Sequence, residues 1–258
     1  MAVAKAIQFL TIFDDTYDNY ATVEEAELFT QIIERWNIDE IDQLPNYMKI
    51  IYRFTFSVFE DYEREAADQG KSFAVPYAKE TIKQVCKAYN KEMKWIMRQE
   101  RPSFQEYIEN SVIAGCIFAI SSPTIPGMKS VTKETIDWLT SVPKIVVASL
   151  TVCRYLDDLG SFNRESKKEK YLTGVDHYMK EHGLSFQETK DKFIELAEDE
   201  WKDLNTEWMN KTWVPKDMLE QILGYVRSSE VFYRSCEDAF ANSEVVQTTL
   251  LLCLSIRL

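Results

Sequence analysis

The sequence is poor in glycine and proline, with 7 of each in 258 residues. Both residues concentrate in turns, so their scarcity argues against turn-rich β structure and favours helices. The sequence also has fewer basic than acidic residues: 30 Lys and Arg against 42 Asp and Glu, which gives a formal net charge of -12. This charge disfavours nucleic acid or an anionic membrane as a partner, because both are polyanions.

Three further features are absent from the sequence. The five cysteines form no CxxC pair, and their odd number and apolar neighbours indicate free thiols in a reducing compartment. No run of about 18 apolar residues is evident, so we expect no membrane span. The start, MAVAKAIQFL, lacks the Arg- and Ser-rich character of a transit peptide, so we expect a cytoplasmic protein.

Helical signals are what the sequence does contain. Thr22 and Glu25 form a capping-box pattern, Pro45 suits the first turn of a helix, and Gly70 suits its end. Without any alternating strand pattern, repeat or low-complexity linker, the sequence predicts one all-α domain of about ten helices. The expected helices are residues 2–20, 23–36, 41–66, 75–98, 103–120, one opened by Thr132, 144–162, and three more beyond Gly174.

Three aspartates follow an apolar run near the start of the chain, in AIQFLTIFDDTYDNY. Burying an unpaired carboxylate is so costly that the group normally loses its charge or finds a cation. On a helix, Asp14 and Asp15 lie four and three residues before Asp18, so these side chains project from one face. The cluster is therefore a candidate half of a metal site.

A second acidic cluster, DDLGSFNRE, ends the apolar helix expected over 144–162. Asp157, Ser161 and Glu165 lie at i, i+4 and i+8, on one helical face. Their oxygens are hard donors that suit Mg²⁺ or Mn²⁺ better than zinc. Arg154, three residues before Asp157, is placed to hold a phosphate oxygen through two hydrogen bonds.

Either cluster alone is more often solvated surface charge or helix capping than a metal site. The two together are more specific, because both follow apolar helical segments and both place carboxylates at helical spacing. We expect the two helices to face each other, so that the clusters form one acidic rim above an apolar cavity.

With both clusters in view, the sequence resembles the plant terpene synthases, specifically their C-terminal class I α-helical domain. DDTYD at 14–18 resembles the aspartate-rich motif of that family. DDLGSFNRE at 157–165 resembles its second metal motif, whose pattern is Asn/Asp, Asp, aliphatic, any, Ser/Thr, three of any, Glu. The resemblance covers essentially the whole chain, since it extends to ERWNIDEIDQLPNYMKIIY, RPSFQEYIENS, CRYLDD and HYMKEHGLS.

The resemblance implies a class I terpenoid synthase barrel, built of helices, that uses Mg²⁺ or alternatively Mn²⁺. It implies that Arg154 is a catalytic residue that binds the diphosphate. The implied metal ligands are Asp14, Asp15, Asp18, Asp157, Ser161 and Glu165.

Two further regions match functional segments of the resembled family. Ala114, Gly115 and Cys116, in ENSVIAGCIFAI, match the place where the cavity-lining helix breaks near the reacting carbons. Gly115 supports a break, because Gly inside a helix is costly, although close helix packing would also explain it. Tyr233 and Asp238, in FYRSCEDAF, match catalytic-site residues that line the pocket near the C-terminal lid loop.

The resemblance also implies parts that this sequence lacks. Members of the family carry an N-terminal helical domain, and their catalytic domain opens with helices that include an Arg-x-Arg segment. We therefore expect residues 1–258 to be the metal-binding domain, incomplete at its N-terminus and without the first helices of its barrel. The N-terminal domain is expected to be absent.

The implied reaction is ionisation of a prenyl diphosphate, here farnesyl diphosphate, to an allylic cation that cyclises to a terpene. The implied protein is a monomer that binds this small molecule, with neither nucleic acid nor a membrane as a partner. The alternative is a catalytically inactive, truncated synthase that at most binds metal and diphosphate. A chain-elongating prenyltransferase is disfavoured, because it would need two DDxxD motifs and the second cluster here has Ser and Glu.

Overall fold

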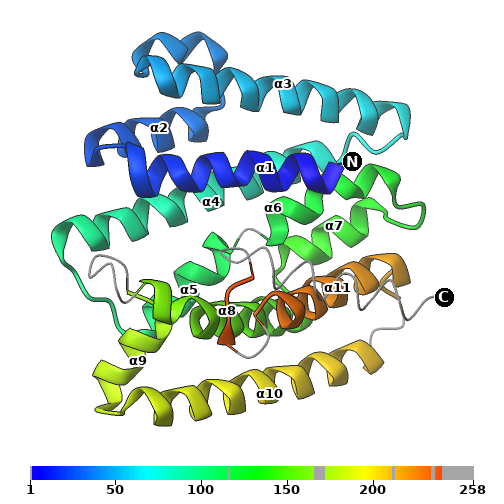
Figure 1. Cartoon of the computed structure of the whole chain (residues 1–258). Coiled ribbons are helices and arrows are strands. Elements are labelled where there is room, and N and C mark those ends of the chain that lie inside the picture. The colour runs from blue at the N-terminus through cyan, green and yellow to red at the C-terminus, as the bar shows by residue number, and fades with distance from the viewer. Residues whose placement is uncertain (1, 116, 166–171, 211–212, 234–235, 240–258) are drawn as a thin grey trace. The chain divides into compact units, whose positions relative to one another are not determined.

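The structure is a computed structural model, and all the regular structure among its described residues is helical (Figure 1), as the sequence predicts. The chain divides into two compact units, and each is described by itself. Unit 1 comprises Met1–Glu100 and Ile113–Ser141, and unit 2 comprises Arg101–Val112 and Val142–Leu258. Whether residues 1–258 act as one domain therefore stays a prediction. The described residues are 2–115, 117–165, 172–210, 213–233 and 236–239.

Unit 1 is built around α1 and α4, which both pack against α3, α6 and the short helix η3. A π-helical turn, η1, continues α1 and also contacts α4. The helices of this unit are α1 (Ala2–Asp15), η1 (Thr16–Tyr20), α2 (Val23–Arg35), η2 (Ile38–Gln43), α3 (Asn46–Asp68), α4 (Ala74–Arg98), α6 (Ile117–Ser121), η3 (Ser122–Gly127) and α7 (Lys133–Thr140).

Unit 2 is built around α8, which packs against α9, α10 and α11. α5 begins in unit 2 and ends in unit 1. The helices here are α5 (Phe104–Ala114), α8 (Lys144–Glu165), α9 (Gly174–His182), α10 (Phe186–Asn210) and α11 (Lys216–Phe232). The core of unit 2 is formed by Tyr107, Ile108, Tyr155, Leu159, Val175, Phe193 and Ala197.

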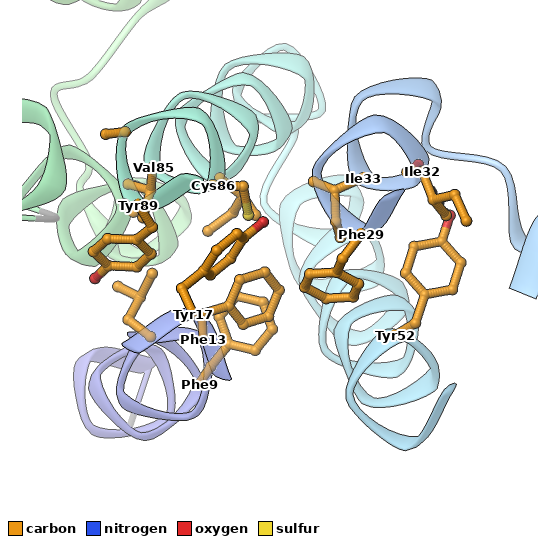
Figure 2. Packing of buried hydrophobic residues seen from close by; sticks show 14 of the residues in the cluster. Phe9, Phe13, Tyr17, Phe29, Ile32, Ile33, Tyr52, Val85, Cys86 and Tyr89 are labelled. Carbon is orange, nitrogen blue, oxygen red and sulfur yellow. Dashed lines mark hydrogen bonds between the residues drawn. The ribbon is translucent and has the colours of Figure 1, made fainter. Parts of the chain in front are cut away.

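Aromatic rings dominate the core of unit 1 (Figure 2). Phe13 packs between Phe9 and Phe29, with ring centroids 4.4 and 5.4 Å away. Tyr17 contacts Phe29 and Tyr89, at 6.1 and 5.8 Å. Truncating one such buried ring typically costs about 3–5 kcal/mol, so this cluster holds α1 and η1 firmly against α2 and α4.

Several predicted helix boundaries are confirmed by their capping contacts. Thr22 accepts a hydrogen bond from the Glu25 backbone, and the Glu25 side chain accepts one from the Thr22 backbone, which completes the capping box. Pro45 immediately precedes α3. Gly70 follows the end of that helix with φ +65°, a conformation that L side chains rarely adopt.

The predicted first helix, residues 2–20, differs from the structure in two ways. The α-helix ends at Asp15 and continues as the π-helical turn η1. The near-continuous apolar sequence of residues 2–13 predicts a helix that is buried all round, and this is wrong, because Ile7 and Ile12 are 42% and 40% exposed. The helix is amphipathic instead, with one face in the aromatic core.

The prediction of 41–66 as one helix is wrong at its start, where η2 ends at Gln43 and α3 begins only after Pro45. The predicted free thiols are confirmed for Cys86, Cys153 and Cys236, of which the first two are buried.

One segment of the described residues passes a membrane-span test by length and composition, although no span is expected from the sequence. Residues Phe104–Gly127 are long and apolar enough to cross a membrane by composition, with a mean hydropathy of 1.3 over 18 residues. This is weak support for a span, because core helices of other proteins pass the same test, and 44% of that window is buried inside the protein. The segment is also divided between α5, α6 and η3.

Candidate functional site

The first acidic motif, DDTYD, lies at the junction of α1 and η1. Its middle residues face inward: Thr16 is 3% exposed and Tyr17 is 1% exposed. The Tyr17 hydroxyl shares a 2.7 Å hydrogen bond with Thr30 and lies beside the Cys86 thiol (Figure 2). Burial raises the pKa of Tyr17 well above its usual value, so this hydroxyl stays neutral.

The three carboxylates of DDTYD are not buried, contrary to the expectation from the apolar run. Asp14 and Asp15 are exposed and Asp18 is half-buried. The π-helical turn also alters the predicted register, because a wider turn rotates Asp18 relative to its α-helical position. Such π-helical insertions are frequent at functional sites. The motif is thus anchored by Thr16 and Tyr17, with Asp14 and Asp15 exposed and Asp18 half-buried.

The second acidic motif lies in the last turns of α8, in unit 2. The side chains of Asp157 and Glu165 are 29% and 26% exposed, while Ser161 is 2% exposed. Arg154 forms an ion pair with Asp157 one turn along the helix, a contact that the sequence analysis did not predict. Because the two motifs belong to different units, their facing each other across a cavity stays a prediction.

A second ion pair of Arg154 was not predicted from the sequence. Asp158, 1% exposed, lies 2.9 Å from the Arg154 guanidinium and also accepts hydrogen bonds from Tyr107 and the Gly174 backbone. Burial raises the pKa of Asp158 to about 7, against the opposing effect of Arg154. Burial also opposes the charge on Arg154, but the two aspartates outweigh it and raise the pKa of Arg154 further.

Tyr233 and Asp238 both contact the region of α8 that carries the motif. The Tyr233 hydroxyl hydrogen-bonds Asp157, and burial together with that carboxylate raises the pKa of Tyr233. Asp238 accepts hydrogen bonds from Arg164 at 2.9 and 3.2 Å, and Arg164 also pairs with Glu165 at 3.0 Å. The structure therefore brings both predicted residues to the second motif.

The predicted break at Ala114, Gly115 and Cys116 is confirmed in its position. α5 ends at Ala114 and α6 begins at Ile117, with Gly115 in the turn between them. Ala114 is 8% exposed and belongs to the hydrophobic core of unit 1. Cys116 lies outside the described residues. Whether the three residues line a substrate pocket stays a prediction.

Comparison with known proteins decides what family these features belong to. The family model described as terpene synthase family, metal binding domain, matches residues 1–203, which contain both acidic motifs. The chain belongs to the terpene synthase family.

Relatives of this terpene synthase chain are named plant synthases. It is 49% identical to tau-cadinol synthase of Lavandula angustifolia over 90% of this chain and 42% of that protein. It is 44% identical to gamma-cadinene synthase of Ocimum basilicum, over 96% of this chain and 46% of that protein. The chain thus spans less than half the length of these relatives.

A solved structure supports the class I terpene synthase fold. Isoprene synthase from grey poplar (Populus x canescens), in complex with three Mg²⁺ ions and dimethylallyl-S-thiolodiphosphate, superposes with a TM-score of 0.85 at 27% identity. The match covers 90% of this chain and 44% of that one.

The terpene synthase metal-binding domain implies a divalent metal, and the donor chemistry of this chain fits one. Each motif offers carboxylate oxygens, the ligands that Mg²⁺ prefers. In the part of the chain that the structure describes, no three His, Cys, Asp or Glu side chains form a ready metal-binding group. Arg154 and Arg164 pair with Asp157 and Glu165, so a metal would compete with these arginines for the two carboxylates.

Two contributors to this site were missed by the sequence analysis. Asp158 was not predicted as a site residue, because it lies outside the i, i+4, i+8 series of Asp157, Ser161 and Glu165. Its own signal was present, since an aspartate four residues after Arg154 lies on the same helical face. Arg164 gave no comparable signal, because its partner Asp238 is distant in the sequence.

Proposed function

We propose that this chain is the metal-binding, catalytic part of a terpene synthase that ionises a prenyl diphosphate and cyclises the resulting allylic cation. The observation that carries the proposal is the presence of both acidic motifs, DDTYD and DDLGSFNRE, within the region that the family model matches.

The proposed metal ligands come from both motifs and hold a shared set of Mg²⁺ ions, with Mn²⁺ as a substitute. When bound, these ions neutralise the diphosphate and act as Lewis acids on the leaving group. The accessible carboxylates of Asp14 and Asp15, together with the half-buried ones of Asp18, Asp157 and Glu165, support this assignment. The proposed ligands are Asp14, Asp15, Asp18, Asp157, Ser161 and Glu165.

Arg154 is proposed to bind the diphosphate. Its guanidinium is always charged, so it stabilises negative charge that builds up on the leaving group as the carbon–oxygen bond breaks. Tyr233 and Asp238 lie at the same end of α8 and complete the proposed catalytic residues. The neutral Tyr233 hydroxyl donates to Asp157 and so helps to orient that carboxylate.

The hydrocarbon is proposed to lie in an apolar pocket that includes Ala114, Gly115 and Cys116. Water must be excluded there, because it would capture the cation. Aromatic rings stabilise a nearby cation by about 0.5–2 kcal/mol per contact. The aromatic content of 13% supplies candidate rings, most of which serve the core.

Farnesyl diphosphate is the proposed substrate, because cadinol and cadinene, the products named for the two relatives, are sesquiterpenes. A monomer in the cytoplasm, with neither nucleic acid nor a membrane as a partner, is proposed as its working state.

The experiment incubates the purified chain with Mg²⁺ and dimethylallyl, geranyl, farnesyl or geranylgeranyl diphosphate and analyses the hydrocarbon products. The same assay is run on a version extended at its N-terminus by the preceding half of the tau-cadinol synthase. A sesquiterpene from farnesyl diphosphate supports the proposal. No product from either version contradicts it.

A second candidate function is binding of metal and diphosphate without turnover. The observation that favours it is that the chain covers only 42% of the tau-cadinol synthase. This second function is assigned to the chain if only the extended version forms product while the chain itself binds diphosphate.

A further inference from the structure

Asp158 and its neighbour Asp157 face different surroundings on α8. Consecutive helical residues point about 100° apart, so one of two adjacent aspartates turns inward when the other faces the site. Asp157 is 29% exposed, whereas Asp158 is 1% exposed. The pair therefore divides into an outward carboxylate and a buried one.

Both oxygens of Asp158 are already occupied by donors from three helices. Oδ1 accepts from the Tyr107 hydroxyl at 2.8 Å and lies 2.9 Å from Arg154 Nη2. Oδ2 accepts from the Gly174 backbone N–H at 3.1 Å. A carboxylate satisfied in this way is a poor metal ligand, because binding a metal would break contacts that offset its burial.

Gly174 shows how closely this carboxylate is enclosed. An ideal Cβ at position 174 would lie 2.4 Å from Asp158 Oδ2 and 2.9 Å from Tyr107 Cε1. Both distances are shorter than real Cβ contacts, so only glycine lets the start of α9 approach Asp158. The N-terminus of α9 also favours a negative charge there.

Arg154 retains donor capacity despite its two ion pairs. Its Nε is a buried atom with no hydrogen-bond acceptor among the described residues. A buried guanidinium that is oriented by carboxylates and still has an unsatisfied N–H is suited to donate a hydrogen bond to an anionic oxygen. The orientation depends on Asp158, because Asp157 is a proposed metal ligand.

We propose that Asp158 is a positioning residue, which holds the Arg154 guanidinium in place for an oxygen of the substrate diphosphate. The inference rests on the proposed function, in which Arg154 binds that group. It extends this function by separating the two aspartates: Asp157 binds metal, and Asp158 binds Arg154, Tyr107 and the start of α9.

The experiment compares Asp158→Asn with Asp176→Asn in the full chain. Asp176 is the matched control, because it also caps the start of α9, through Thr173 N–H at 2.8 Å and Thr173 Oγ1 at 2.9 Å. Among the contacts of the described residues, Asp176 forms neither an ion pair nor a hydrogen bond with Arg154. If Asp158 only secured α9, both variants would therefore behave alike.

Two readouts are measured on each variant. The first is the ¹⁵N NMR signature of hindered guanidinium rotation, assigned to Arg154 by its loss in Arg154→Lys. It is read in the metal-free protein with Asp157→Ala also present, because Asp157 pairs with Arg154 as well. The second is the affinity for inorganic diphosphate in Mg²⁺, by calorimetry. We expect Asp158→Asn to lose the hindered signature and to weaken diphosphate binding about tenfold or more. Asp176→Asn should keep both.

Tyr107→Phe provides a second, milder variant if Asp158→Asn does not fold. It removes one hydrogen bond to Asp158 and leaves the Arg154 pair, so we expect a smaller loss of diphosphate affinity in the same direction. A hindered signature that survives in Asp158→Asn, or an equal loss of affinity in Asp176→Asn, overturns the proposal. If Asp158→Asn cannot be folded, an unchanged diphosphate affinity in Tyr107→Phe also overturns the proposal.

Failure of the proposed function gives a different result. If the unmodified chain binds no diphosphate in Mg²⁺, the proposed function fails for this chain. The guanidinium signature then still decides whether Asp158 positions Arg154, since it is read without metal or diphosphate.

Discussion

At the scale of single residues, Tyr17 links the aromatic core to the first acidic motif. It lies between Asp15 and Asp18 in the sequence, yet it is 1% exposed, with its hydroxyl bonded to Thr30. The burial of this one ring therefore fixes where the neighbouring carboxylates can point.

Two replacements of Tyr17 distinguish the contribution of its hydroxyl to stability from that of its ring. We expect Tyr17→Phe to lower the free energy of unfolding by about 1 kcal/mol, because it removes the hydrogen bond to Thr30. Thr30 still donates to the Ala26 carbonyl at 2.8 Å, so its own hydroxyl stays bonded. Tyr17→Ala should cost about 3–5 kcal/mol. Urea unfolding followed by circular dichroism measures both, and equal losses in the two variants would refute this division.

Buried tyrosines also predict how stability depends on pH. Burial raises the pKa of Tyr52 to about 12, whereas the unfolded residue titrates near 10. The unfolded state therefore loses this proton first. The contribution of Tyr52 to stability is complete below pH 10 and is lost as the pH rises through 12.

The test measures urea midpoints of the protein and of Tyr52→Phe between pH 9 and 12. Each such group contributes a slope of at most about 1.4 kcal/mol per pH unit. The variant should therefore lose less stability over this interval than the unmodified protein. Parallel pH profiles would show that Tyr52 does not contribute.

Residue-level prediction from sequence succeeded where spacing along one helix was sufficient. The spacing of three residues places Arg154 and Asp157 on one helical face, and the structure pairs them there. The contacts of Asp158 with Tyr107 and Gly174 could not be predicted, because they join helices distant in the sequence. Helical periodicity reports the face of a residue but not what packs on that face.

At the scale of elements, Gly160 controls how closely α8 approaches Tyr233, the residue that follows α11. An ideal Cβ at Gly160 would lie 2.7 Å from Tyr233 Cδ1 and 3.4 Å from the Glu237 carbonyl. Tyr233 in turn bonds Asp157 through its hydroxyl. The missing side chain therefore lets Tyr233 reach the second acidic motif.

Gly160→Ala should destabilise the protein by about 1–3 kcal/mol, because the added methyl group displaces the Tyr233 ring. Gly224→Ala is the matched control: Gly224 lies inside α11, and no side chain or other segment of the described residues comes within 4 Å of its ideal Cβ. There the alanine should stabilise by about 0.5–1 kcal/mol, through its higher helix propensity. The free energies of unfolding of both variants measure this contrast, and equal effects would contradict the packing described here.

Helix positions were predictable from caps and periodicity, whereas departures from α-helical geometry were not. The Thr22 capping box and the start of α3 after Pro45 follow from local side-chain chemistry. The π-helical turn Thr16–Tyr20 carries no sequence signal of its own, since it results from the packing of Tyr17 into the core. This is why the predicted register of Asp14 and Asp18 needed correction.

At the scale of the whole molecule, composition and helix signals were sufficient to predict an all-α chain, and the resemblance of both motifs and their flanking segments to plant terpene synthases predicted the family. Few glycines and prolines exclude a turn-rich fold, and two acidic motifs at helical spacing specify the kind of chemistry. The exposure of Asp14 and Asp15 was not predictable, because the apolar run before them is amphipathic and not uniformly buried.

The central claim is that the two acidic motifs bind one shared set of divalent ions together with diphosphate. Groups that act as one site are non-additive when they are removed, whereas independent sites lose binding additively. One variant removes the first motif by Asp14→Ala and Asp18→Ala, another removes the second by Asp157→Ala and Glu165→Ala, and a third combines them.

The deciding measurement is diphosphate-dependent Mn²⁺ binding by electron paramagnetic resonance, with helical content checked by circular dichroism. The account predicts that loss of either motif abolishes this binding and that the combined variant loses nothing more. Binding that survives the loss of one motif, or losses that add in the combined variant, would contradict it.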